Sequence, residues 1–112
     1  MTTTAIGKRG EDLTRQWLLH NNFTIVERNW KTRWCEIDII AEKQGIIYFV
    51  EVKFRKNSSF GDGFDYITAK KQQQKQFAAE FWLKQHNYGG ECQLAAASID
   101  GTTDAVEFLA DL

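Results

Sequence analysis

The sequence predicts a small α/β domain in which helices flank a mixed sheet. Three observations support this fold class: two stretches with helical periodicity, three consecutive strand-like stretches joined by short turns, and a later apolar stretch. An antiparallel meander of three strands followed by a helix and another strand builds one layered sheet. The chain has 112 residues, the length of one domain, so we expect a single domain over residues 1–112.

Two helices are predicted from the spacing of apolar residues. The first covers residues 6–20, and its apolar positions recur at intervals of three and four: Ile6, Gly10, Leu13 and Trp17. Asn21 and Asn22 are expected to end it. Thr68 is the expected N-cap of the second helix, which runs to about Gln85. Residues 88–90, Tyr-Gly-Gly, are expected to close that helix.

Strands are predicted where apolar and polar residues alternate. The first three cover residues 23–30, 34–42 and 46–55, and a short turn at residues 43–45 joins the last two into a hairpin. The apolar stretch at residues 92–99 suits a strand that is buried on both faces. Residues 105–109 suit either a last strand or a short helix.

Composition excludes several classes of protein. Hydrophobic residues make up 43% and charged residues 26% of the chain, as in globular proteins and unlike disordered or fibrous chains. The longest apolar run, residues 46–50, is far too short to span a membrane, and the first four residues contain no apolar signal region. We therefore expect no membrane partner and a cytoplasmic protein whose two cysteines are reduced thiols.

Charge is distributed unevenly along the chain. All 14 Lys and Arg residues but only 10 of the 15 acidic residues lie within residues 1–84. Residues 85–112 carry the other five acids and no Lys or Arg. This asymmetry favours a basic face on the first three quarters of the fold. An ordinary solvated surface explains the same distribution, so charge alone leaves the partner open.

The most informative feature is the charge inside two strands that are otherwise apolar on both faces. Glu36 and Asp38 lie in the strand at residues 34–42, and Glu51 and Lys53 lie in the next one. Because alternate residues of a strand share a face, regular alternation puts both acids of the earlier strand on one side, away from its isoleucines at 37 and 39. A buried unpaired carboxylate costs several kcal/mol, so these groups need partners or a metal.

The hairpin register predicts how these charges meet. A tight turn over residues 43–46 pairs residues whose numbers sum to 89, which sets Asp38 opposite Glu51 and Glu36 opposite Lys53. Opposed side chains have Cβ atoms about 4.5–5.5 Å apart, and two carboxylates that close repel each other without a cation or proton. Oxygen ligands without His or Cys favour Mg²⁺ or Mn²⁺, here with Glu36 as a supporting carboxylate. A buried salt-bridge set, with Glu36 paired to Lys53 and Asp38 hydrogen-bonded to the backbone, is the alternative.

These motifs resemble a known group of enzymes. Asp38, followed thirteen residues later by Glu51-Val52-Lys53, matches the Asp…Glu-x-Lys pattern of the restriction-endonuclease-like PD-(D/E)XK nucleases. More closely, the chain resembles the bacterial YraN-like family, relatives of archaeal Holliday-junction resolvases. The other segments that carry this resemblance are Gly7-x-x-Gly10-Glu11, Arg28-Asn29-Trp30, Glu36-Ile37-Asp38 and Phe60-Gly61.

The resemblance implies a restriction-endonuclease-like core and a metal-dependent nuclease that hydrolyses phosphodiester bonds of nucleic acid, with DNA as the expected substrate. It implies that Asp38, Glu51 and Lys53 are catalytic, with Lys53 orienting or deprotonating the attacking water. The implied ligands of Mg²⁺ or Mn²⁺ are Asp38, Glu51, the Val52 carbonyl and Glu11. Glu11 has a second interpretation, as a first-turn acid favoured by the helix dipole. Resolvase relatives act as dimers, so a homodimer is also implied.

Four basic residues are candidates for contact with nucleic acid: Arg55, Lys56, Lys71 and Lys75. The first two follow the expected catalytic lysine, and the last two share a helix face, for which a solvated surface is the alternative. Basic residues also interleave with Trp30 and Trp34, which suits a nucleic-acid groove, although such tryptophans are more often core residues. The alternative function is a non-catalytic nucleic-acid-binding or adaptor module on the same fold.

Overall fold

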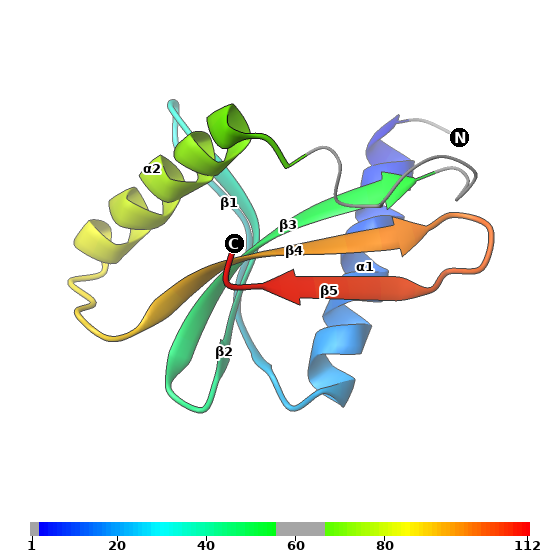
Figure 1. Cartoon of the computed structure of the whole chain (residues 1–112), viewed down its shortest axis with the longest axis horizontal. Helices are drawn as coiled ribbons and strands as arrows, with labels where there is room; N and C mark the ends of the chain where they lie inside the picture. The colour runs from blue at the N-terminus through cyan, green and yellow to red at the C-terminus, as the bar shows by residue number, and fades with distance from the viewer. Residues whose placement is uncertain (1–2, 56–66) are drawn as a thin grey trace.

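The computed structural model describes residues 3–55 and 67–112 and confirms the mixed α/β architecture (Figure 1). Two helices, α1 (Thr3–His20) and α2 (Ala69–Gln85), flank one sheet. The five strands lie side by side in chain order: β1 (Thr24–Lys31), β2 (Glu36–Lys43), β3 (Ile46–Arg55), β4 (Cys92–Asp100) and β5 (Val106–Ala110).

One of the four strand pairs in the sheet is parallel, and the other three are antiparallel. The strands β1, β2 and β3 form an antiparallel meander, β4 runs parallel to β3, and β5 returns antiparallel at the edge. A parallel pair needs a long crossover, which α2 provides between β3 and β4. Of residues 105–109, for which the sequence left a strand or a short helix open, 106–109 belong to the edge strand β5.

The sheet buries a separate core on each face. On the α1 side the core includes Leu18 of the helix, with strand residues such as Ile39, Val50 and Ala97. On the α2 side it includes Ala78, Ala79 and Trp82 of that helix, packed on Trp30, Ile37, Ile40, Ile47 and Phe49. Residues 95–99 of β4 are all buried, which confirms a strand covered on both faces.

The β2–β3 hairpin adopts the predicted register. Its two-residue turn has positive φ at Gln44 (52°) and Gly45 (80°), as a type I′ turn requires. The ladder runs from Lys43 paired with Ile46 to Ile39 paired with Val50. Each of these pairs sums to 89, so the register is confirmed over this stretch.

The helix boundaries follow local capping. The Thr68 hydroxyl accepts a hydrogen bond of 3.2 Å from the Lys71 N–H, which confirms the predicted N-cap of α2. Asn22 ends α1 with φ 69°, as predicted. The expected glycine stop of α2 is wrong, because Asn87 adopts the left-handed conformation (φ 52°) and Tyr88 N–H bonds to Leu83 O. Neither helix in the described ranges is long and apolar enough to cross a membrane.

The strand β1 departs from regular alternation. A bulge between Ile25 and Glu27 leaves Val26 out of the ladder and 45% exposed. The sequence predicted uninterrupted alternation from residue 23 to 30, which is wrong at this point. A bulge adds one residue to a strand and so reverses the faces of all that follow.

Candidate active site

The candidate site lies where β2 and β3 separate. Their ladder ends at the pair Ile39 and Val50, and Asp38 is the next residue of β2. Its Oδ2 accepts a hydrogen bond of 2.8 Å from the Val52 N–H, so the side chain bridges the two strands where their backbones no longer pair. The predicted pairs of Asp38 with Glu51 and of Glu36 with Lys53 are not formed, because the ladder ends at Ile39 and Val50. Asp38 instead contacts β3 through its hydrogen bond with the Val52 N–H, and Glu36 pairs with Lys31 of β1.

The alternation of β2 side chains between the two faces of the sheet is interrupted at Asp38. Ile37 belongs to the α2-side core, whereas Ile39 belongs to the α1-side core, although residues two apart share a face in a regular strand. On β1 the pairing skips Asn29, whose φ is 53°, a left-handed conformation that Asn tolerates. The sequence predicted one face for both isoleucines, which is wrong because this irregularity interrupts the alternation.

Asp38 is a carboxylate that the fold disfavours in its charged form. Burial is the largest cause that raises its pKa, and the nearby charges of Glu51 and Glu36 raise it further. The Val52 N–H and the charge of Lys75 act in the opposite direction. Asp38 also lines a cavity of about 40 Å³ together with Glu36, which has room for a water molecule.

Glu11 reaches the same region from α1. The helix approaches β3 closely at Gly10, where a Cβ atom would lie 3.3 Å from Phe54 Cβ. The Glu11 side chain is 16% exposed, and burial followed by the charge of Asp38 raises its pKa. The helix begins at Thr3 with no acid in its first turn, so the interpretation of Glu11 as a first-turn acid is wrong.

Arg28 and Asn29 of β1 contact the acidic residues in the middle of α1. The Arg28 guanidinium donates to Asp12 Oδ1 at 2.7 Å and lies 3.7 Å from Glu11 Oε1. A hydrogen bond from the Asn29 side chain lowers the pKa of Glu11 and so favours its charged form. The sequence predicted Arg28 as one of the basic residues beside Trp30 that suit a nucleic-acid groove and gave Asn29 no role, because a contact between a helix and a strand has no local signal.

Glu51 is partly neutralised by lysines of α2. Its Oε1 lies 3.4 Å from Lys75 Nζ and 3.9 Å from Lys71 Nζ, and its side chain is 15% exposed. These distances describe ion pairs that are longer than a charge-assisted hydrogen bond. Both lysines are predicted contacts of nucleic acid, and the structure puts them beside a predicted metal ligand.

The other predicted residues that the structure describes are Lys53, Glu36 and Arg55. Lys53 and Glu36 are exposed, and within the described part of the chain they form no ion pair with each other, so this part of the alternative is wrong. Its other part, a backbone hydrogen bond to Asp38, is present and comes from the Val52 N–H. Arg55 donates a hydrogen bond of 3.0 Å from Nε to the buried Ser98 hydroxyl of β4. Lys56, like the Phe60-Gly61 motif, lies outside the described residues.

The donors around Asp38 suit a hard divalent cation. Carboxylates of Asp38, Glu11 and Glu51 and the Val52 carbonyl are oxygen ligands, which Mg²⁺ and Mn²⁺ prefer. Within residues 3–55 and 67–112 no three His, Cys, Asp or Glu side chains are grouped closely enough to hold a metal as they stand. The charge of Asp38 nevertheless raises the pKa of Glu11, and the charge of Glu51 raises the pKa of Asp38.

The sheet order, the crossover helix and the carboxylate at the break between the second and third strands define a small restriction-endonuclease-like core. The model of the uncharacterised protein family UPF0102 matches residues 10–107. The chain belongs to this family, which confirms the resemblance to the bacterial YraN-like proteins.

Relatives from distant bacteria support this assignment. A UPF0102 protein of Dictyoglomus turgidum is 43% identical over 84 residues, which cover 75% of this chain and 71% of the relative. One from Neisseria meningitidis is 37% identical over 97 residues, or 86% of this chain and 84% of the relative. One from Fusobacterium nucleatum is 36% identical over 88 residues, with 79% and 74% covered. The similarity thus extends over most of each protein.

Proposed function

We propose that the chain is a divalent-metal-dependent nuclease that hydrolyses phosphodiester bonds of nucleic acid, with DNA as the expected substrate. The observation that carries this proposal is the position of Asp38. It is a largely buried carboxylate with a raised pKa, held at the break between β2 and β3 and facing further acids on two sides. Perturbed carboxylates of this kind gather at functional sites more than in structural cores.

The cost of this cluster argues for a cation. Burial and neighbouring acids oppose the ionisation of both Asp38 and Glu11, and a purely structural core would be more stable with neutral groups there. A divalent ion compensates such charges, and its affinity for the site then offsets the cost. Asp38, Glu11, Glu51 and the Val52 carbonyl would hold the ion. Mg²⁺ or Mn²⁺ polarises a phosphate and lowers the pKa of its own water when bound.

Lysines of the chain supply the other charges that phosphodiester hydrolysis needs. Lys53 follows Glu51 by two residues on β3 and is exposed, so its Nζ can orient a water molecule or accept its proton. Lys71 and Lys75 stand on the rim formed by α2, where ammonium groups offset the negative charge of a phosphate. Of these groups, Lys71 and Lys75 already contact a carboxylate of the cluster through Glu51.

One observation favours the alternative of a non-catalytic nucleic-acid-binding or adaptor module. The ion pairs of Glu51 with Lys71 and Lys75 compensate part of the acidic charge without a metal. Such a module would bind nucleic acid in a salt-dependent manner and keep that binding in the Asp38→Asn variant.

Cleavage and metal binding distinguish the two functions. Purified protein is incubated with Mg²⁺ or Mn²⁺ and single-stranded, duplex, flap and four-way DNA, and Mn²⁺ binding is measured by calorimetry. We expect cleavage of at least one substrate, which Asp38→Asn and Lys53→Ala abolish while circular dichroism shows both variants folded. Intact Mn²⁺ binding without cleavage of any substrate would contradict the nuclease and leave the binding module.

A further inference from the structure

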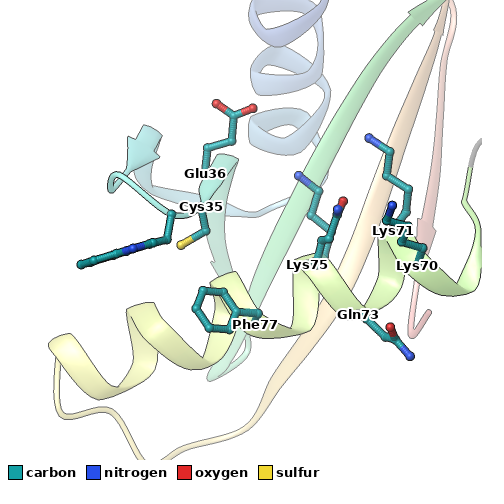
Figure 2. A pocket seen from close by; sticks show the side chains of 9 residues that line it. Cys35, Glu36, Lys70, Lys71, Gln73, Lys75 and Phe77 are labelled. Carbon is teal, nitrogen blue, oxygen red and sulfur yellow. The ribbon is translucent and has the colours of Figure 1, made fainter.

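A groove of about 550 Å³ lies between α2 and the segment that leads into β2 (Figure 2). Lys70, Lys71 and Lys75 line it from the first half of the helix, together with Phe77 one turn further on. Trp34 and Glu36 line it from the opposite side. Because Lys71 and Lys75 also pair with Glu51, the groove adjoins the carboxylate cluster.

Aromatic side chains are unusually open to solvent in this groove. Trp34 is 66% exposed and Phe77 is 51% exposed, the two highest values among the large hydrophobic residues that the structure describes as exposed. Phe81 connects them, with ring centroids 6.0 Å from Trp34 and 6.3 Å from Phe77. Phe81 of α2 therefore links the exposed ring on the helix side of the groove to the exposed ring on the opposite side. Because the Trp34 indole is mostly exposed, part of its ring surface is open for stacking.

The charge of the groove is mostly positive. Three lysines line it, and the Arg33 guanidinium lies 5.4 Å from the centre of the Trp34 ring. Figure 2 shows Lys71 and Lys75 projecting from the same side of α2. Glu36 is the one carboxylate among the lining residues, and its charge opposes that of the lysines. Cations beside exposed aromatic rings match the phosphates and bases of a nucleic-acid strand.

We propose that this groove binds a single-stranded segment of nucleic acid, with an unpaired base stacked on Trp34 and phosphates held by the α2 lysines. In a duplex the faces of internal bases are covered by their neighbours, so an exposed indole has no base to stack on, whereas lysines alone would accept either form. The inference rests on the proposed function in naming this strand as the substrate, which the groove directs toward Asp38. The single-stranded arm of a branched nucleic acid is one such strand.

Binding is tested separately from cleavage. The Asp38→Asn protein is titrated in EDTA with labelled oligodeoxythymidine and oligouridine of about 12 nucleotides, and anisotropy is recorded. Adding Trp34→Ala is expected to weaken the affinity by about 5- to 150-fold, the range for loss of one base–aromatic stack. Adding Trp34→Phe preserves most of it. Leu19→Ala, an exposed residue of α1 on the other face of the sheet, is the matched control and leaves the affinity unchanged.

Competition tests the class of partner. A blunt duplex of equal length and polyglutamate should displace the oligonucleotide much less effectively than an unlabelled single strand. The strand that binds more tightly shows whether the substrate is DNA or RNA. Tighter binding of either strand supports the inference. Equal affinity of the Trp34→Ala and parent proteins, or equal competition by the duplex or by polyglutamate, would overturn it.

These outcomes keep the two proposals distinct. If the wild-type protein cuts no substrate but the strand binds through Trp34, the nuclease assignment fails and the groove assignment stands. If the wild-type protein cuts DNA and Trp34→Ala changes neither binding nor cleavage, the groove assignment fails and the nuclease assignment stands.

Discussion

Asp38 Oδ2 accepts its 2.8 Å hydrogen bond from the Val52 N–H one residue beyond the end of the β2–β3 ladder. The carboxylate thus takes the place of a strand carbonyl and satisfies a backbone donor that the separating strands would leave unpaired. No other hydrogen bond to Asp38 comes from the residues that the structure describes. Its second oxygen therefore remains available at the point where Glu11 and Glu51 approach.

The first prediction concerns the stability of the Asp38→Asn variant without metal. Asparagine keeps an oxygen for the Val52 N–H but removes a charge that burial and two neighbouring acids oppose. We expect the free energy of unfolding in EDTA to increase by about 1 kcal/mol, while cleavage is lost. Urea denaturation measures this change. Asp38→Ala, which also removes the hydrogen bond, should have a lower free energy of unfolding than the wild type. A free energy of unfolding for Asp38→Asn below that of the wild type would show that the charge of Asp38 does not destabilise the fold.

The second prediction follows from the raised pKa values of Asp38 and Glu11. A raised pKa means that the protonated forms stabilise the fold. This contribution is complete below the ordinary carboxyl pKa of about 4 and is lost as the pH rises through the raised values. The double variant Glu11→Gln and Asp38→Asn mimics the protonated state, so its advantage in Tm over the wild type should grow from about pH 4 to neutrality.

Thermal melts at a series of pH values in EDTA measure this difference. Glu42→Gln, an exposed acid in the same strand as Asp38, is the matched control and should leave the pH profile unchanged. Saturating Mn²⁺ should raise the Tm of the wild-type protein at neutral pH, because the ion stabilises the charged forms of the two carboxyl groups. A constant Tm difference across the pH range would show that these carboxyl groups are not coupled to folding.

Much of the fold could be predicted because its signals are local. The two-residue turn at Gln44 and Gly45 fixed the hairpin register, which in turn placed Asp38 beside β3. Thr68 and Asn22 marked helix ends through capping, which depends only on neighbouring residues. The predicted pairs of Asp38 with Glu51 and of Glu36 with Lys53 extended that register further along the strands and failed, because the ladder ends at Ile39 and Val50.

The rest could not be predicted because it depends on contacts between distant segments. The reversal of facing at Asp38 accompanies the left-handed backbone of Asn29 on the neighbouring strand. The pairing of Glu51 with Lys75 joins β3 to the crossover helix, 24 positions further along the chain. Trp34 was expected in the core, as most tryptophans are, and only the structure separates it from the buried Trp30.

A third prediction links Glu51 to the groove. Its carboxylate attracts Lys71 and Lys75, which the groove offers to phosphates. Glu51→Gln should therefore raise the affinity for a single strand in EDTA by about 2- to 5-fold, the size of an exposed ion pair, and abolish cleavage. Anisotropy at several salt concentrations measures this gain, which should shrink as salt screens the charges. Glu80→Gln, on the same helix but outside the groove, is the control; an unchanged or weaker affinity for Glu51→Gln would show that these lysines do not hold the strand.

The last prediction tests whether the backbone of β1 shapes the site. Asn29 has φ 53°, a conformation that glycine adopts freely and a β-branched residue does not. Asn29→Val should lower the free energy of unfolding by about 1–2 kcal/mol or more through steric conflict, whereas Asn29→Gly should cost less. Lys31→Val, an exposed position of the same strand without positive φ, controls for the valine itself and should change the stability by less than about 0.5 kcal/mol.

The two Asn29 variants also separate backbone from side chain. Asn29→Gly preserves the reversal beside Asp38 but removes the hydrogen bond that lowers the pKa of Glu11, so this pKa should rise further while the strand geometry is kept. Carboxyl titration by NMR measures the first effect and amide chemical shifts of β2 report the second. If Asn29→Val proved as stable as Lys31→Val and left the β2 amide shifts unchanged, the left-handed residue would not be what holds Asp38 at the break between the strands.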